Sequence, residues 1–251
     1  MTLLLKSDKA IGEPASLSLK SVQTDKYNTV FAGHKSIFNF IDLPDTVADG
    51  NPIDDVYILG KQASTLGSQS NITANKGISF IENATDKAVI LPDAWDLNKY
   101  IGTESTVVMG IWLTLNTTPA ATLGIYGWKY SSNTQFYVTI NSASRIQAFA
   151  GDKAVGLNTL TVAQRVLIHF EFKFSSVGNS VACGVNGTIM ESMTNVTYAT
   201  PSGSSPRIGK IDSFNSAGFT VHRAFLRKFD PAKTTAAAII SDEYNKFFSK
   251  L

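Results

Sequence analysis

The sequence predicts an all-β protein, a two-sheet antiparallel sandwich with a short C-terminal helix and an N-terminal arm. Apolar and polar residues alternate with a period of two from about residue 77 onward, and turn-forming residues separate these runs. Residues 236–248 contain neither Gly nor Pro, which favours one helix near the C-terminus. Short, regularly spaced strands joined by turns are typical of sandwiches rather than of α/β folds.

Two long alternating runs, residues 107–115 and 166–174, each predict a strand with one face in a core and the other partly exposed. In the first run, the apolar face carries Val107, Met109, Ile111, Leu113 and Leu115. In the second run, it carries Val166, Ile168, Phe170, Phe172 and Phe174. The other face of the second run carries Leu167, His169, Glu171 and Lys173. Shorter strands are expected at residues 136–140, 145–150 and 180–185.

Asn186 and Gly187 are the strongest hairpin signal in the chain, because both residues tolerate a positive φ. They follow an alternating run that contains Cys183, which we expect to be a small buried residue. As the only cysteine, it has no partner for an internal disulfide. Residues 131–134 and 141–144 are further predicted turns.

The C-terminal helix is expected to have Asp230 as its N-cap and Pro231 at its first helical position. Its apolar stripe consists of Ile239, Ile240, Tyr244, Phe247 and Phe248. We therefore expect the helix to pack across the sandwich.

Residues 1–70 predict an N-terminal arm or a small strand-bearing extension, and residues 71–251 the sandwich domain. Within the arm, residues 42–55 hold five acidic residues and no basic one: Asp42, Asp45, Asp49, Asp54 and Asp55. Carboxylate oxygens are ligands for Ca²⁺, but the run does not match an EF-hand loop. A solvated linker is the default interpretation, and calcium binding stays open.

The charge balance argues against a nucleic-acid partner. Lys and Arg number 22 against 20 Asp and Glu, a formal net charge of +2, which lacks the electrostatic footprint of a dedicated nucleic-acid binder. The apolar run at residues 2–5 is too short for a signal peptide, and no run approaches the ~18 apolar residues of a membrane span. We therefore expect synthesis in the cytoplasm, no membrane insertion and no nucleic-acid binding.

Taken in order, these runs resemble the concanavalin A-like, or laminin-G-like, jelly roll found in lectins, glucanases and many phage structural proteins. Trp112 matches the central tryptophan of a family strand, and Asn186-Gly187 matches the turn of its long hairpin. The other matching segments are residues 77–80 and 88–92 as an opening strand pair, 165–174, 207–209, and 219–229 before the helix. The fold supports both binding and catalysis, so the resemblance alone does not assign a function.

Catalytic residues are not evident. Glucanases of this fold place carboxylates on alternate residues of one strand, where one attacks the sugar and the other protonates the leaving oxygen. Glu171 is the only acid in its strand, so a His169–Glu171 acid–base pair is a weaker interpretation than an exposed polar row. His34, His169 and His222 lack the spacing of a zinc site. We therefore expect a protein that is not an enzyme, with no catalytic residues, no metal and no cofactor.

An aromatic row is the most suggestive binding feature. Tyr126, Trp128 and Tyr130 share one face of a predicted strand, and Tyr137 lies opposite in the predicted hairpin. Aromatic rings stack on the apolar faces of sugars, so the row predicts a glycan platform. The alternative is sheet stabilisation, since a cross-strand aromatic pair contributes about 0.2–1 kcal/mol. The remaining tryptophans, Trp95 and Trp112, are expected to serve packing.

The resemblance and the lack of a catalytic constellation favour a structural or adhesive component of a phage-like particle. Such a component would reside in the virion and take part in assembly or host-surface attachment. Its partners would be other copies of itself, as a homo-oligomer, other virion proteins and a host-surface glycan. The alternative is a carbohydrate-binding lectin module that uses the aromatic row, and a glycan hydrolase is the less favoured third hypothesis.

Overall fold

The computed structural model describes residues 35–43, 46–47, 52–54, 62–66, 70–73, 77–92, 95–127, 136–198, 205–211 and 214–248. The chain divides into two compact units, Met1–Val30 and Phe31–Leu251, and all the described residues belong to the second. No helix among these residues is long and apolar enough to cross a membrane.

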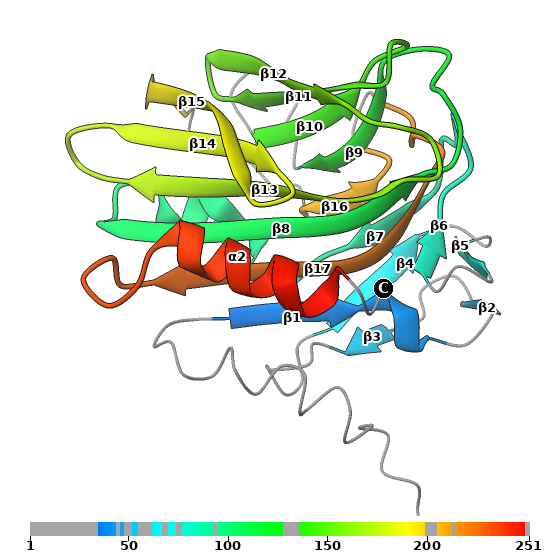
Figure 1. Cartoon of the computed structure of the whole chain (residues 1–251), viewed down its shortest axis with the longest axis horizontal. Helices are drawn as coiled ribbons and strands as arrows, with labels where there is room; N and C mark the ends of the chain where they lie inside the picture. The colour runs from blue at the N-terminus through cyan, green and yellow to red at the C-terminus, as the bar shows by residue number, and fades with distance from the viewer. Residues whose placement is uncertain are drawn as a thin grey trace, which may run out of the picture. The chain divides into compact units, whose positions relative to one another are not determined.

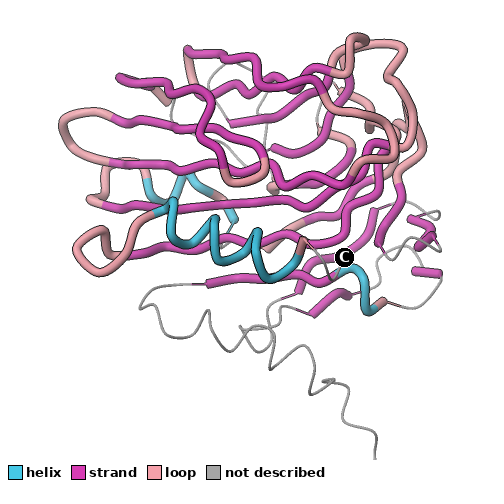
Figure 2. The backbone as a smooth tube through the Cα atoms, viewed as in Figure 1, coloured by secondary structure: helices cyan, strands magenta, loops and turns pink. Residues whose placement is uncertain are grey.

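Strands dominate the second unit and form two antiparallel sheets (Figures 1 and 2). Among the described residues, sheet A has nine strands, in the order β15-β14-β13-β8-β17-β6-β5-β2, with β1 also paired to β17. Their bounds are β15 (Thr188–Val196), β14 (Asn179–Val185), β13 (Arg165–Phe174), β8 (Ser105–Leu115), β17 (Phe219–Phe229), β6 (Gly77–Ser79), β5 (Ser70–Thr73), β2 (Thr46–Val47) and β1 (Lys35–Asn39).

Sheet B has eight strands among the described residues, in the order β12-β11-β10-β9-β16-β7-β4-β3. Their bounds are β12 (Lys153–Thr159), β11 (Arg145–Ala150), β10 (Phe136–Ile140), β9 (Leu123–Gly127), β16 (Arg207–Gly209), β7 (Ala88–Ile90), β4 (Gln62–Leu66) and β3 (Pro52–Asp54). The connections that the structure describes include two short 3₁₀ helices, η2 (Phe40–Asp42) and η4 (Leu97–Tyr100). The predicted all-β, two-sheet antiparallel sandwich is confirmed.

One hydrophobic core lies between the sheets and draws on the inward residues of both. The ring of Phe136, from sheet B, packs edge-to-face on Phe170 and Phe172 of sheet A, with centroids 4.9 and 4.7 Å apart. Such edge-to-face pairs are a preferred aromatic geometry. The alternating residues predicted for the two long strands therefore face this core.

The outward face of β8 differs from the prediction. We expected it to be partly exposed, but Val108 and Trp112 are fully buried there. The cause is α2 (Ala236–Phe247), which lies across this face of sheet A (Figure 1) and forms a second apolar cluster with it. A surface that is covered by a helix needs apolar residues on both faces of the strand beneath.

The helix is confirmed, but its predicted cap is wrong. Thr235 is the N-cap, and its side-chain oxygen accepts a hydrogen bond from the Ala238 N–H at 3.1 Å. Asp230 instead accepts from the Ala232 N–H at 2.9 Å, in a turn that precedes the helix. The carboxylate therefore stabilises the entry turn, and the helix begins five residues later than its expected first position, Pro231.

A buried polar network ties α2 to sheet A. Arg223 Nε lies 2.6 Å from Glu243 Oε1, and Trp112 Nε1 donates to the same oxygen at 3.2 Å. The Arg223 guanidinium also hydrogen-bonds to Asn39 and lies over the Phe247 ring, 3.9 Å from its centroid. Because these groups are buried, each charge is satisfied by protein atoms rather than by water.

The hairpin predicted at Asn186 and Gly187 is confirmed. These residues join β14 to β15 with φ values of 51° and 86°, as a two-residue type I′ turn requires. The Asn186 side chain also accepts from the Leu167 N–H at 2.9 Å, which fastens the turn to β13.

Strands before residue 70 belong to the sandwich. β1 pairs with β17 in sheet A, and β4 pairs with β7 in sheet B, so the compact unit begins earlier than the predicted domain start at residue 71. The predicted opening strand pair is also divided, because β6 lies in sheet A and β7 in sheet B. Residues 1–34 of the predicted arm, together with 44–45, 48–51, 55–61 and 67–69, lie outside the described residues.

Candidate functional site

The structure removes Tyr126 from the predicted glycan platform. Its side chain is 0% exposed and packs in the core, with ring centroids 6.4 Å from Trp95 and 6.1 Å from Phe136. Burial, with a smaller contribution from Asp96, raises the pKa of Tyr126 well above its ordinary value. Since β9 turns this residue inward, it is not a ligand contact. Trp128 and Tyr130 lie outside the described residues, so their part in a platform stays a prediction.

Tyr137 faces outward and belongs to a different aromatic group. It pairs with Phe149 across β10 and β11, and their rings stack with centroids 4.5 Å apart and planes at 10°. The ring of Phe214 stacks on Tyr137 at 5.6 Å and 27°. All three side chains are partly exposed. We call Tyr137, Phe149 and Phe214 the aromatic stack, which lies on the outward face of sheet B.

A short chain reversal places Phe214 on this face. Ile211 and Phe214 exchange backbone hydrogen bonds of 3.0 and 2.7 Å. Gly124 N–H then donates to Asn215 O at 2.7 Å, which ties the reversal to β9. A Cβ on Gly124 would lie 2.6 Å from Cγ1 of Ile211, so a glycine is needed where this segment crosses the sheet.

A polar row runs beside the aromatic stack. Thr139 pairs with Gln147, and Gln147 pairs with Gly156, two residues along from the Tyr137–Phe149 pair. The polar row and the aromatic stack are two residues apart along the strands, a distance of about 7 Å. The Arg145 guanidinium covers Gly156, with Nε donating to Leu157 O at 3.1 Å. Thr139 is fully buried, and its Oγ1 has no hydrogen-bond partner among the described residues.

Together the two rows offer apolar ring faces beside directional polar groups. Partial burial raises the pKa of the Tyr137 hydroxyl, so this group remains a protonated hydrogen-bond donor at neutral pH. The amide of Gln147 donates and accepts, and the guanidinium of Arg145 only donates. Apolar surface with a few placed polar groups is the usual composition of a small-molecule site.

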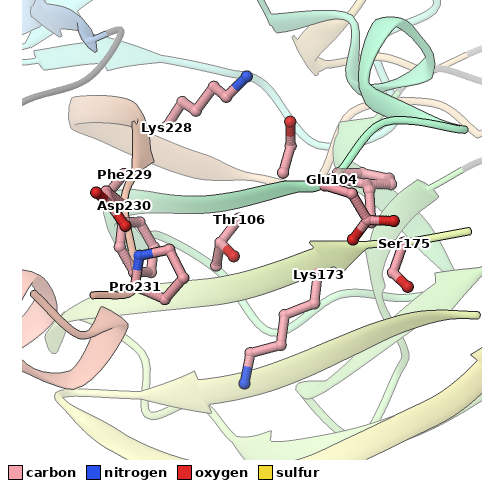
Figure 3. Close-up of a pocket in the computed structure, with 10 residues that line it drawn as sticks. Glu104, Thr106, Lys173, Ser175, Lys228, Phe229, Asp230 and Pro231 are labelled. Atoms are coloured by element: carbon pink, nitrogen blue, oxygen red, sulfur yellow. The ribbon is translucent and has the colours of Figure 1, made fainter. Parts of the chain in front are cut away.

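A cavity of about 560 Å³ lies at one end of sheet A, where β8, β13 and β17 meet their loops (Figure 3). Asp230 and Pro231 stand on one side, Glu104 and Ser175 on the other, and Thr106 lies between them. Its carboxylates already have partners. Glu104 Oε1 accepts from the backbone and hydroxyl of Ser176 at 2.9 and 3.0 Å, bonds that lower the pKa of Glu104. These groups therefore hold the loops together, which makes this cavity the weaker candidate.

Neither interpretation of His169 and Glu171 fits the structure fully. Glu171 is partly exposed and pairs with Lys173 at 3.3 Å, as a polar row would. His169 is fully buried, and neither ring nitrogen has a hydrogen-bond partner among the described residues. Its ring covers Gly184, where a Cβ would lie 2.3 Å from Cε1. Desolvation lowers the pKa of His169 to about 4, so the ring is neutral and is not an acid–base partner of Glu171.

The structure places the other singled-out residues in packing roles. Cys183 is buried in the core, as expected, and burial with Glu191 nearby raises the pKa of its thiol to about 12. Trp95 and Trp112 are fully buried, which confirms their expected role in packing. Trp95 also donates to Ser36 Oγ at 2.7 Å.

No metal centre is formed within the part of the chain that the structure describes, where no three His, Cys, Asp or Glu side chains gather. His222 is buried, with Nε2 2.9 Å from Thr114 Oγ1. His34 and three of the five aspartates of the acidic run, Asp45, Asp49 and Asp55, lie outside the described residues, so calcium binding there stays a prediction.

Sequence reasoning missed Phe149, Gln147 and Arg145, although β11 carried a signal for them. They alternate with the apolar residues Ile146, Ala148 and Ala150 and therefore occupy the outward face of the predicted strand. Large apolar residues such as Phe149 usually face the core, so an aromatic residue at an outward position of a strand points to a binding surface. Phe214 had no such signal, because it stands in a turn whose position depends on the folded sheet.

No family model and no curated protein matches the chain, but solved structures do. Trypanosoma rangeli sialidase in complex with sialic acid matches with a TM-score of 0.57 and 15% identity, over 83% of this chain and 32% of that one. A mutant of this sialidase that displays trans-sialidase activity matches with 0.57 and 16%, over 90% and 38%. Botulinum neurotoxin type C, whose cell entry depends on interaction with two ganglioside molecules, matches with 0.54 and 10%, over 88% and 52%.

This chain spans between about a third and a half of the length of these structures. At such low identity the likeness shows the fold alone, and it is consistent with the concanavalin A-like sandwich expected from the sequence. One expectation is corrected. We expected a protein that is not an enzyme, but sialidases, which are enzymes, are among its structural matches, so that exclusion does not stand.

Proposed function

We propose that this chain is a carbohydrate-binding β-sandwich that takes a glycan on the outward face of sheet B. The observation that carries the proposal is the stack of three partly exposed rings, Tyr137, Phe149 and Phe214. A sugar ring has an apolar face and polar edges, which suit ring surfaces beside the amide of Gln147. The glycan-related structural matches support the same class of ligand.

The competing role for the stack is stabilisation of the sheet. A cross-strand aromatic pair contributes about 0.2–1 kcal/mol to stability, so such a role is small. The two roles differ in what the loss of one ring changes: ligand affinity in the first case and only stability in the second.

The test is a glycan-binding screen on the purified protein, followed by Phe149→Ala and the control Phe248→Ala. Phe248 is 51% exposed and stacks on Tyr244 at the end of α2, on the other sheet. We expect the Phe149 variant to lose affinity by about two- to tenfold, since one ring contact contributes about 0.5–1.5 kcal/mol. The Phe248 variant should bind as the wild type does. Equal affinity in the two variants would contradict the proposed site.

A second prediction concerns a phage-like particle. In this role the chain would be a structural or adhesive virion component that contacts copies of itself and other virion proteins. Its adhesive form is compatible with glycan binding, because attachment to a host surface requires a surface ligand. Light scattering on the purified chain tests self-association, and a monomer at all concentrations would argue against a homo-oligomeric particle component.

A further inference from the structure

The polar row beside the aromatic stack carries one fixed positive charge. We infer that the site takes an anionic saccharide and that Arg145 binds its carboxylate or sulfate group. This inference rests on the proposed function and specifies the class of glycan.

Backbone carbonyls hold the guanidinium of Arg145 on the outward face of sheet B. The ladder between β11 and β12 shifts register between Arg145 and Gln147, which lets the side chain turn across β12. Nε donates to Leu157 O at 3.1 Å, and Nη2 lies 3.5 Å from Gly156 O. Arg145 is exposed, and no carboxylate pairs with it among the described residues. An oriented guanidinium without a counter-ion presents N–H donors in one plane, which can bind two oxygens of a planar carboxylate or of a tetrahedral sulfate group.

Gly156 makes this placement possible. A Cβ at this position would lie 2.7 Å from Nη2 and 2.8 Å from Cζ and Nε of Arg145. Any larger residue would therefore displace the guanidinium, while the chain kept its charge. Because the displaced group is the end of a flexible side chain, the sheet itself would be little disturbed.

The charge and the rings are spaced for one ligand. Gln147 pairs with Gly156, so the guanidinium stands beside Gln147 in the polar row. That row is about 7 Å from the aromatic pair, on the order of one sugar residue. The neighbours of Tyr137 and Phe149 on the flanking strands are the small residues Gly127 and Ala154, and Phe214 stacks on the Tyr137 ring. A saccharide stacked on the rings therefore presents a substituent to Arg145.

The experiment compares three polysaccharides by calorimetry or affinity electrophoresis: polygalacturonate, dextran sulfate and neutral dextran. We expect tighter binding to at least one polyanion than to dextran, with an advantage that weakens as salt rises. Arg145→Gln should reduce the advantage by about tenfold, to near the affinity for dextran. Gly156→Ala should lower it too, although no charge is lost. The control Lys173→Gln removes an equal charge from the outward face of sheet A and should leave binding unchanged.

The outcomes separate this inference from the function on which it rests. If Arg145→Gln keeps the wild-type preference for polyanions, or if wild type binds dextran equally well, the anionic assignment is wrong. In either case a loss of binding in Phe149→Ala would still support a glycan site. If wild type binds none of the three polysaccharides, the anionic assignment is wrong, and the glycan-binding screen with Phe149→Ala decides separately whether the proposed function stands. The preference between polygalacturonate and dextran sulfate identifies the anionic group.

Discussion

The outward positions of β11 show what residue types reveal before a structure is known. Arg145, Gln147 and Phe149 fall on the outward phase of a strand whose other residues are apolar and buried. Periodicity places them on one face, but it does not show that Tyr137 stacks on Phe149 or that a glycine lies beneath Arg145. Those contacts depend on the cross-strand register, which the pattern of one strand does not contain.

His169 is the residue for which the sequence was most misleading. Its strand position predicted an exposed polar side chain, but the ring is buried without a hydrogen-bond partner among the described residues. Gly184 on one neighbouring strand leaves room for the His169 ring, while the Phe225 ring lies over Gly110 on the other strand. Burial at an outward position depends on these neighbours, and α2 covers another part of the same face.

The buried His169 predicts a loss of stability in acid. The folded-state pKa is about 4, below the unfolded value of about 6.5, so the unfolded chain binds a proton that the folded chain excludes. The free energy of unfolding should therefore fall by about 3 kcal/mol between pH 6.5 and pH 4, and the full contribution should be present above pH 6.5. Urea unfolding of wild type and His169→Leu at pH 7.5 and 4.5 measures this difference. Equal pH dependence in the two proteins would show that His169 is not its source.

At the scale of elements, long alternating strands and the type I′ hairpin were predictable because their signals are local. β10, β11 and β17 coincide with their expected ranges. The early strands were not predictable, since β2 has two residues and β3 three, and such short strands exist only by pairing with a neighbour. The burial of both faces of β8 was missed for a related reason, because it depends on α2, which is more than 100 residues away in the sequence.

At the start of α2, the observed N-cap residue Thr235 can be compared with Asp230, the N-cap that the sequence predicted. Thr235 caps the helix through the Ala238 N–H, and Asp230 bonds to the Ala232 N–H in the preceding turn. Thr235→Ala should lower the free energy of unfolding by about 0.5–2 kcal/mol, the usual effect of a lost N-cap. Asp230→Ala, which leaves the cap intact, should have the smaller effect. Thermal unfolding of both variants decides the matter, and the reverse order would restore Asp230 as the cap.

For the whole molecule, the two outward faces of the sandwich have different roles. On sheet A, α2 covers the middle of the face, and the buried Arg223–Glu243 pair fastens it there. On sheet B, the described residues at the Tyr137–Phe149 pair include small neighbours rather than a covering helix. The sequence predicted the sandwich but not this asymmetry, because an apolar helix stripe does not specify which face it covers.

This asymmetry predicts that aromatic residues of the same strand pair contribute very differently to stability. Phe136 is fully buried between the sheets, so Phe136→Ala should lower the free energy of unfolding by about 3–5 kcal/mol. Phe149 lies partly exposed on the other face of the sheet, so Phe149→Ala should cost less than about 1 kcal/mol. Urea unfolding followed by tryptophan fluorescence measures both values. A small stability loss together with a clear affinity loss in the Phe149 variant would separate binding from packing. A loss as large as that of Phe136 would instead make the aromatic stack part of the folded core, because only a ring that the fold requires has that effect.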